Sequence, residues 1–152
     1  MNKRPLIQIT LLFAAILLAM SVTLNSTDVK AQDIEYYLDH EYAKIWINST
    51  DGTIDLFYNI TIMCTQGVIH YARVGQPKHD FTIGQAKDEE GHILSTSDAS
   101  SGEYYAVRVN LHNPISAGQS ARFTLLTNVG HMIWEDEDNP GNVGMQFIPC
   151  WW

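Results

Sequence analysis

Three histidines are the first residues in this chain whose chemistry suits a metal ion. His70, His79 and His92 lie on or near segments that we expect to form adjacent strands, and Asp80 follows His79. A zinc site needs three or four ligands that converge at about 2 Å, usually with recognisable local spacing. Neither His-x-x-x-His nor His-Glu-x-x-His is present. Surface or half-buried histidines explain the pattern better than a metal-dependent hydrolase, which stands last among the functional alternatives.

An acidic segment near the end of the chain begins like a calcium loop. An EF-hand places an oxygen ligand at its fifth position and a bidentate carboxylate at its twelfth. Counted from Asp136, these positions hold Pro140 and Phe147, so the motif fails. A looser calcium site that uses Asp136 and Asp138 stays open as an alternative. We otherwise expect no metal and no cofactor.

Nucleophilic catalysis finds no motif in the sequence. Gly-x-Ser-x-Gly, which places a serine on a strand-to-helix turn, is missing. Cys64 ends an apolar segment, a setting that favours packing or pairing over a reactive thiolate. The other cysteine is Cys150, and in an oxidising compartment the two would form the one possible disulfide. Two separate buried thiols are the alternative. We therefore expect a protein that is not an enzyme.

Exposed aromatic side chains are the remaining candidates for a binding site. Trp46 and Phe57 are expected to face each other across a hairpin, on the side away from the core. A cross-strand aromatic pair stabilises a sheet by about 0.2–1 kcal/mol, so a structural role is sufficient. The same pair would equally suit sugar stacking or a protein contact. Trp151 and Trp152 end the chain, and packing of the last strand, interfacial anchoring and partner docking all stay open for them.

The hairpin itself is the clearest structural signal. Alternating apolar and polar residues at 43–48 and 54–62 flank Asp51-Gly52, which is typical of a two-residue turn. Such a turn places Thr50 opposite Thr53. It then pairs residues on the polar face as Asn48 with Asp55, Trp46 with Phe57 and Lys44 with Asn59, and on the core face as Ile47 with Leu56, Ile45 with Tyr58 and Ala43 with Ile60.

The polar face also carries two N-glycosylation acceptor patterns. These are Asn48-Ser49-Thr50 and Asn59-Ile60-Thr61. Glycosylation requires a surface asparagine, and the alternation places both Asn48 and Asn59 away from the core.

The rest of the chain reads as further short strands separated by turns. No stretch shows a sustained helical period, and we expect 113–119 to be a loop. Short strands with frequent turn signals are typical of an antiparallel sandwich. We therefore predict one all-β domain over 32–152, a β-sandwich that is immunoglobulin-like in general architecture. The further strands are expected at 68–74, 81–86, 92–95, 105–111, 121–128, 131–134 and 143–148.

The amino-terminal segment predicts export. Lys3 and Arg4 precede a largely apolar run that extends from Pro5 to Leu24. This order is typical of a secretory signal, and small residues at Val29 and Ala31 favour cleavage after Ala31. The alternative is an uncleaved hydrophobic helix that anchors the chain. Residues 1–31 are thus a signal peptide or a signal anchor. Either reading places the remainder outside the cytoplasm, secreted or held at the outer face of the membrane.

Charge narrows the choice of partners. The whole chain has 17 acidic and 9 basic residues. One of these acids (Asp28) and three of the bases (Lys3, Arg4 and Lys30) precede the predicted cleavage site. The predicted exported part therefore has 16 acidic and 6 basic residues and is more acidic than the whole chain. Nucleic-acid binding needs a clustered basic face, and none is present. We expect an envelope protein or a glycan as the partner, and membrane contact only through an uncleaved amino-terminal segment.

Several short motifs resemble the amino-terminal domains of uncharacterised archaeal exported or membrane-anchored proteins. They extend over nearly all of 35–152 and comprise Asn48-x-x-Asp51-Gly52, Gly75-x-Pro77, Asp88-x-x-Gly91, Pro114-Ile-x-x-Gly-Gln-Ser120 and Phe147-x-Pro-x-Trp-Trp152. The Pro-Ile-x-x-Gly part is also similar to the β-sandwich that precedes some zinc aminopeptidase domains, without the catalytic part. The resemblance implies a β-sandwich and transfers no activity.

These observations predict a non-enzymatic extracytoplasmic binding or envelope-associated module. The alternatives are a carbohydrate-binding module that uses Trp46 and Phe57, and a membrane-tethered accessory subunit of a larger complex.

Overall fold

A computed structural model describes residues 33–148, and all regular elements in that range are β-strands. The predicted amino-terminal segment, Cys150, Trp151 and Trp152 lie outside the described residues. The strands are β1 (Glu35–Asn48), β2 (Thr53–Gln66), β3 (Val68–Gly75), β4 (Phe81–Asp88), β5 (Ile93–Leu94), β6 (Thr96–Asp98), β7 (Ala106–Ser116), β8 (Ser120–Val129), β9 (Ile133–Glu135) and β10 (Val143–Met145).

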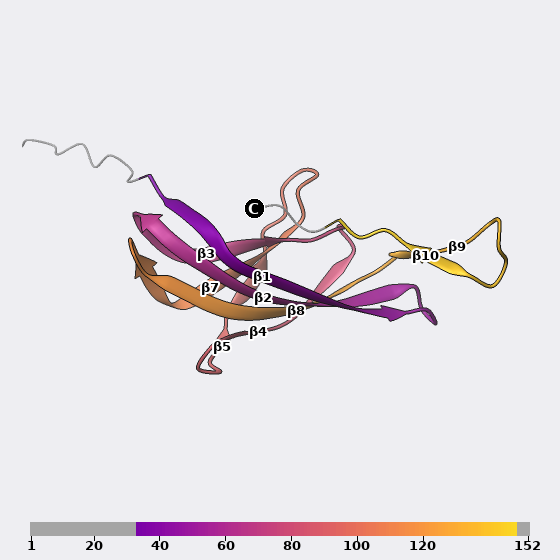
Figure 1. The fold of residues 1–152 in the computed structure, drawn as a ribbon, viewed down its shortest axis with the longest axis horizontal. Helices are drawn as coiled ribbons and strands as arrows, with labels where there is room; N and C mark the ends of the chain where they lie inside the picture. The colour runs from indigo at the N-terminus through magenta and orange to yellow at the C-terminus, as the bar shows by residue number, and fades with distance from the viewer. Residues whose placement is uncertain (1–32, 149–152) are drawn as a thin grey trace, which may run out of the picture. The chain divides into compact units, whose positions relative to one another are not determined.

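Two antiparallel sheets pack against each other, which confirms the predicted β-sandwich. One sheet has five strands in the order β1-β2-β8-β4-β5, and the other has three in the order β3-β7-β6. A separate two-stranded hairpin, β9-β10, extends beyond them (Figure 1). Figure 1 shows β1, β2 and β8 as long curved strands lying side by side. Strands distant in sequence are therefore neighbours, and β2 pairs with β8 along most of its length.

The core forms between the sheets from alternate residues of the long strands. On β2, every second residue from Ile54 to Cys64 is buried, while the residues between them are half-buried or exposed. Side chains in a strand point alternately to opposite faces, so this pattern marks one inward face. Phe123 and Leu125 of β8 join the same cluster, and Val107 and Val109 of β7 meet them from the other sheet.

The β1–β2 hairpin forms at the predicted place but with a longer turn. A two-residue type I′ turn needs positive φ at both central residues. Only Gly52 has a positive φ here, at 74°. The Asp51 carboxylate instead builds the turn: Oδ1 accepts hydrogen bonds from the Thr53 N–H at 3.0 Å and the Thr53 hydroxyl at 2.8 Å. Its Oδ2 accepts one from Asn48 Nδ2 at 2.9 Å.

This turn makes the predicted register wrong by two residues. Asn48 pairs with Thr53, and the four residues 49–52 connect the strands. The predicted pairs Asn48–Asp55, Trp46–Phe57 and Lys44–Asn59 are therefore not formed, and those on the core face shift equally. Because the side-chain period is two, a shift of two residues keeps every side chain on its predicted face.

The predicted burial of β1 is confirmed in part for Ile45, which packs against the core, and is wrong for Ile47 and Ala43. Ile47 is 55% exposed and Ala43 is exposed, although their neighbours Ile54 and Tyr58 on β2 are fully buried. β1 is the edge strand of the five-stranded sheet, and the opposing sheet has only three strands. The inward face of β1 is consequently covered only in part, at Leu38 and Ile45.

Strand β7 continues through part of the predicted 113–119 loop. It extends to Ser116, and Ile115 pairs with Ile69 of β3 and is buried. The connection to β8 is a short turn in which Gly118 has a φ of 82°. Pro114 lacks an N–H, so it weakens a strand without excluding one next to a bulge. The β3–β7 pair has such an irregularity between Ile69 and Tyr71.

Candidate functional site

Four side chains form a row across the outer face of the five-stranded sheet. Trp46 of β1 pairs with Asp55 of β2, Asp55 with Asn128 of β8, and Asn128 with Thr82 of β4. Residues opposite each other in an antiparallel sheet project from the same face. An indole, a carboxylate, an amide and a hydroxyl thus lie in line, with Trp46 42% exposed.

Hydrogen bonds hold the middle of this row. Asn128 Nδ2 donates to Asp55 Oδ1 at 2.8 Å and to the Thr53 hydroxyl at 3.3 Å. These bonds fix the orientation of the amide and place its carbonyl oxygen on the other side. A carboxylate accepts several hydrogen bonds, so Asp55 keeps acceptor capacity beyond the one used by Asn128.

The row borders an open groove of about 560 Å³. One cause of the hollow is Gly84 on β4, which has no side chain. A Cβ added there would lie 2.9 Å from the Leu126 carbonyl oxygen and 3.1 Å from Leu126 Cβ. A larger residue would therefore meet the neighbouring backbone. The lining residues are Trp46, Asp55, Thr82, Ile83, Gly84, Leu126, Thr127 and Asn128.

A second row of side chains flanks the groove. Lys44 pairs with Phe57, and Phe57 pairs with Leu126. The Lys44 ammonium lies 4.6 Å from the centre of the Trp46 ring, which is a cation–π contact. This contact restrains the indole at the end of the groove. Phe57 is half-buried between its two neighbours and does not line the groove.

Of the predicted aromatic pair, the structure thus brings Trp46 to the groove and leaves Phe57 beside it. Asp55, Asn128, Thr82 and Gly84 were not predicted as site residues. The local signal for Asp55 was its outward position in the alternation of β2. Its neighbours on β8 and β4 come from distant parts of the chain, and no local pattern places them beside it.

The three histidines considered for a zinc site do not come together. His70 is exposed on β3, and the ring of His79 packs at 5.8 Å from that of Tyr105. Within residues 33–148, the groups of three or more potential metal ligands include His92 but neither His70 nor His79. His92 is instead close to Asp88 and Glu90, two residues that the sequence analysis did not single out as ligands.

Asp136 caps a turn in the β9–β10 hairpin. Its Oδ1 accepts N–H bonds from Asp138 at 3.0 Å and Asn139 at 3.2 Å, and its Oδ2 accepts one from Asn139 Nδ2 at 2.9 Å. These bonds, chiefly that from the Asn139 side chain, lower the pKa of Asp136 below its ordinary value of 3.8. A turn role accounts for Asp136, and it forms no ligand group with Asp138 in the described part of the chain.

The lowered pKa of Asp136 predicts how this turn responds to acid. A carboxyl group whose pKa is lower in the folded than in the unfolded state stabilises the fold at pH values above its unfolded-state pKa. That stabilisation is lost as the pH falls through the folded-state pKa. We expect the Asn139 side-chain amide signals in NMR spectra to shift with a midpoint below pH 3.8. A midpoint at or above that value would contradict the hydrogen-bonded turn.

Cys64 is a buried thiol whose Sγ lies 3.3 Å from the Gln66 carbonyl oxygen, and its predicted partner Cys150 lies outside the described residues.

The two asparagines of the N-glycosylation patterns differ in exposure. Asn48 is exposed at the hairpin end. Asn59 is half-buried in mid-strand, where its Oδ1 accepts a hydrogen bond from Arg122 Nε at 2.9 Å. Both asparagines lie on the outer face, with Asn48 the more accessible.

Comparison with known proteins does not assign the chain to a family. The chain matches no protein-family model and none of the curated proteins. Among residues 33–148, no helix has the length and apolar character to cross a bilayer.

Proposed function

We propose that this protein is a non-enzymatic extracytoplasmic binding module whose outer-face groove binds carbohydrate. The observation that carries the proposal is the exposed indole of Trp46 at a groove that also contains the Asp55–Asn128 pair. A ligand pocket of this kind combines an apolar surface with a few oriented polar groups.

The chemistry of a sugar matches this arrangement. One face of a pyranose ring presents C–H groups, and its rim presents hydroxyls that both donate and accept hydrogen bonds. The C–H face suits a flat aromatic surface such as Trp46. Donating hydroxyls suit the Asp55 carboxylate, and the amide of Asn128 and the hydroxyl of Thr82 serve as further partners. Leu126, 40% exposed, adds apolar surface on the floor of the groove.

The form of the groove favours an extended ligand over a small enclosed one. The groove follows a row of residues from the edge strand β1 to β4. Its lining comes from four neighbouring strands, so a chain of sugar units is able to lie across them.

The extracytoplasmic location is part of the same proposal. The basic residues and apolar run before Ala31, together with the outward positions of Asn48 and Asn59, support it. Mass spectrometry of the mature protein distinguishes its two forms, because a first residue at Gln32 means cleavage and release, whereas Met1 means a retained anchor.

Loss of the indole tests carbohydrate binding. Trp46→Ala is expected to weaken binding of glycan-array ligands or insoluble polysaccharides by about thirtyfold, which corresponds to about 2 kcal/mol for a central aromatic contact. Isothermal titration with the best array ligand measures the change.

Trp134→Ala is the matched control. Trp134 is 48% exposed on β9 and also has a lysine ammonium, that of Lys78, over its ring at 5.3 Å. It does not line the groove, so its loss should leave binding unchanged. Equal binding by wild type and Trp46→Ala, or no carbohydrate bound by the wild type, would refute the proposal.

A further inference from the structure

A tight turn after β4 gathers three potential metal ligands at the surface. Asp88, Glu90 and His92 each offer one ligand atom, and these atoms all lie within 4.8 Å of one another. The sequence spacing is Asp-x-Glu-x-His, so alternate residues of one turn supply the donors. The group lies in residues that the outer-face groove does not use.

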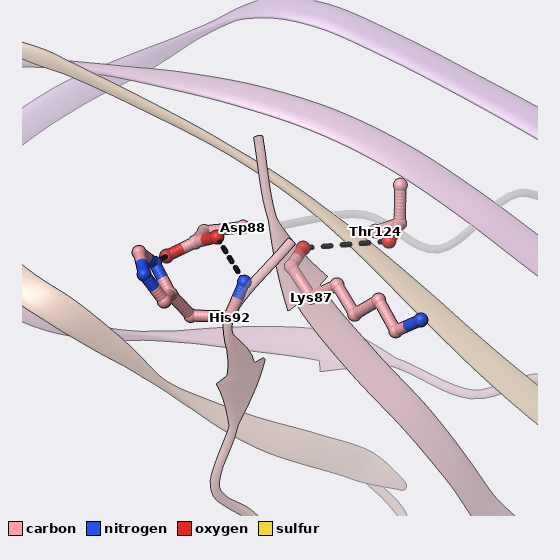
Figure 2. Close-up of polar contacts among 4 residues, drawn as sticks. All are labelled: Lys87, Asp88, His92 and Thr124. Carbon is pink, nitrogen blue, oxygen red and sulfur yellow. Dashed lines mark hydrogen bonds and ion pairs between the residues drawn. The ribbon is translucent and has the colours of Figure 1, made fainter. Parts of the chain in front are cut away.

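Hydrogen bonds between Asp88 and His92 fix this turn. Asp88 Oδ1 accepts the His92 N–H at 2.7 Å, and Oδ2 lies 2.9 Å from His92 Nδ1 (Figure 2). The Gly91 N–H donates to the Asp88 carbonyl at 3.2 Å, with Gly91 at a φ of 89°. Figure 2 also shows the Thr124 hydroxyl donating to the Lys87 carbonyl, which holds the end of β4 against β8.

The turn concentrates negative charge beside the guanidinium of Arg122, which lines the same surface hollow. Asp88, Glu89 and Glu90 are consecutive acids, and among the described residues their one ion pair is that between Asp88 and His92. A bound cation would offset part of this charge.

A hollow lies directly beside these acids. It has a volume of about 120 Å³, and its lining includes all three acids, four residues of β7 and Arg122 of β8, whereas His92 lies outside the lining. This space is large enough for an ion with water ligands, since a water molecule takes up about 30 Å³ of liquid volume. The hollow is a feature independent of the hydrogen bonds within the turn.

His112 packs on the imidazole of His92. The ring centres are 4.7 Å apart and the ring planes are 16° from parallel. Imidazole lone pairs lie in the ring plane, so those of two stacked rings point side by side and do not converge on one ion. We therefore treat His112 as a residue that positions His92.

We propose that Asp88, Glu90 and His92 form a binding site for a divalent transition-metal ion such as Zn²⁺. Ligand bonds of about 2.0–2.2 Å place tetrahedral donor atoms roughly 3.3–3.6 Å apart, so small side-chain rotations from the present arrangement suffice. An imidazole donor favours zinc or copper over calcium or magnesium. Water would complete the coordination from the hollow.

This site is separate from the proposed carbohydrate groove. Asp88 pairs with Phe123 of β8, whereas the groove contains Asn128 of the same strand. Five residues of extended strand span about 17 Å. Failure of either proposal therefore leaves the other standing.

Titration of the full-length protein in mild detergent with Zn²⁺ tests the site. We expect the wild type to bind one Zn²⁺ through this turn, and His92→Asn and Glu90→Gln each to weaken that binding by about tenfold or more. Glu90 is exposed, so Glu90→Gln tests the site without disturbing the fold.

His131→Asn is the matched control. His131 Nδ1 lies 2.6 Å from Asp80 Oδ2, the other histidine–aspartate pair of the described residues, and no third donor joins it. His131 has a φ of 54°, and asparagine tolerates that conformation better than most residues. This variant should bind Zn²⁺ as the wild type does.

Electron paramagnetic resonance with substoichiometric Cu²⁺ identifies the donors. Nitrogen coupling should be present in the wild type and in His112→Phe, in which a ring still packs on His92, and absent in His92→Asn. The proposal is overturned if the wild type binds no Zn²⁺, if His131→Asn weakens binding as much as His92→Asn, or if His112→Phe removes the nitrogen coupling.

Discussion

Phe123→Ala is expected to lower the free energy of unfolding by about 3–5 kcal/mol. Phe123 is 1% exposed and projects from β8 into the core between the sheets. Truncation removes its buried apolar surface and leaves a cavity that the surrounding strands fill only in part. A single domain of this size has about 5–15 kcal/mol of stability, so this loss is a large fraction of the total. Urea unfolding followed by far-UV circular dichroism measures it.

Leu126→Ala provides the control on the same strand. Leu126 is 40% exposed on the outer face, so its truncation should change stability by less than about 1 kcal/mol. Phe123→Leu should lie between the two variants, because most of the volume is kept. Similar losses for Phe123→Ala and Leu126→Ala would contradict the assignment of inner and outer faces on β8.

Thr127→Val is expected to destabilise the protein by about 1–3 kcal/mol, because it leaves a buried acceptor without a partner. The Thr127 hydroxyl donates to Gln76 Oε1 at 2.8 Å, and both residues are buried. Gln76 Nε2 in turn donates to the Gly75 carbonyl at 2.9 Å. This chain of bonds links β8 in one sheet to the end of β3 in the other. Thermal or urea unfolding measures the loss.

A double-mutant cycle separates this bond from packing. Combining Thr127→Val with Gln76→Met removes both partners, so the double variant should be more stable than the sum of the two single losses predicts, by about 0.5–3 kcal/mol. Strict additivity would show that the two side chains act independently and that the hydrogen bond does not join the sheets.

The two faces of β8 explain why binding variants should leave the fold intact. Phe123, Leu125 and Val129 point inward and are buried, whereas Leu126 and Asn128 point to the groove. Alternation along one strand thus places the core and the groove on opposite sides of the sheet. Substitutions at Trp46 or Asn128 consequently change the groove with little effect on the core.

Local sequence patterns were sufficient for most of the strands, though not for β6, and for the faces of the central ones. The alternation from Ile54 to Ile62 predicted which side of β2 is buried, and Asp51-Gly52 located the hairpin. The same pattern did not predict the register, because the Asp51 carboxylate bonds to Asn48 and Thr53 and lengthens the turn. Turn conformation depends on such side-chain bonds as well as on the residue types.

The residues that line the groove show the limit of local patterns more clearly. Trp46 was identified as an exposed aromatic from the alternation of its strand, although most of the edge strand β1 is exposed on both faces. Its neighbours in the groove depend on the order of strands in the sheet, which pairs β2 with β8 and β8 with β4. The proposed metal-ligand group was not predicted for a different reason: Asp-x-Glu-x-His matches no standard spacing, and a tight turn rather than a helix brings the side chains together.

The amino-acid sequence by itself determined that this chain forms alternating strands, because a period of two in hydrophobicity is a property of neighbouring residues. The tertiary structure alone decided that β1 lies exposed at an edge, that Trp46 shares a groove with Asp55 and Asn128, and that His112 stacks on His92. The physical reason is distance along the chain. Contacts between segments tens of residues apart depend on how the sheets assemble and pack. The hydrophobic pattern of a single segment does not show which other segment it will contact.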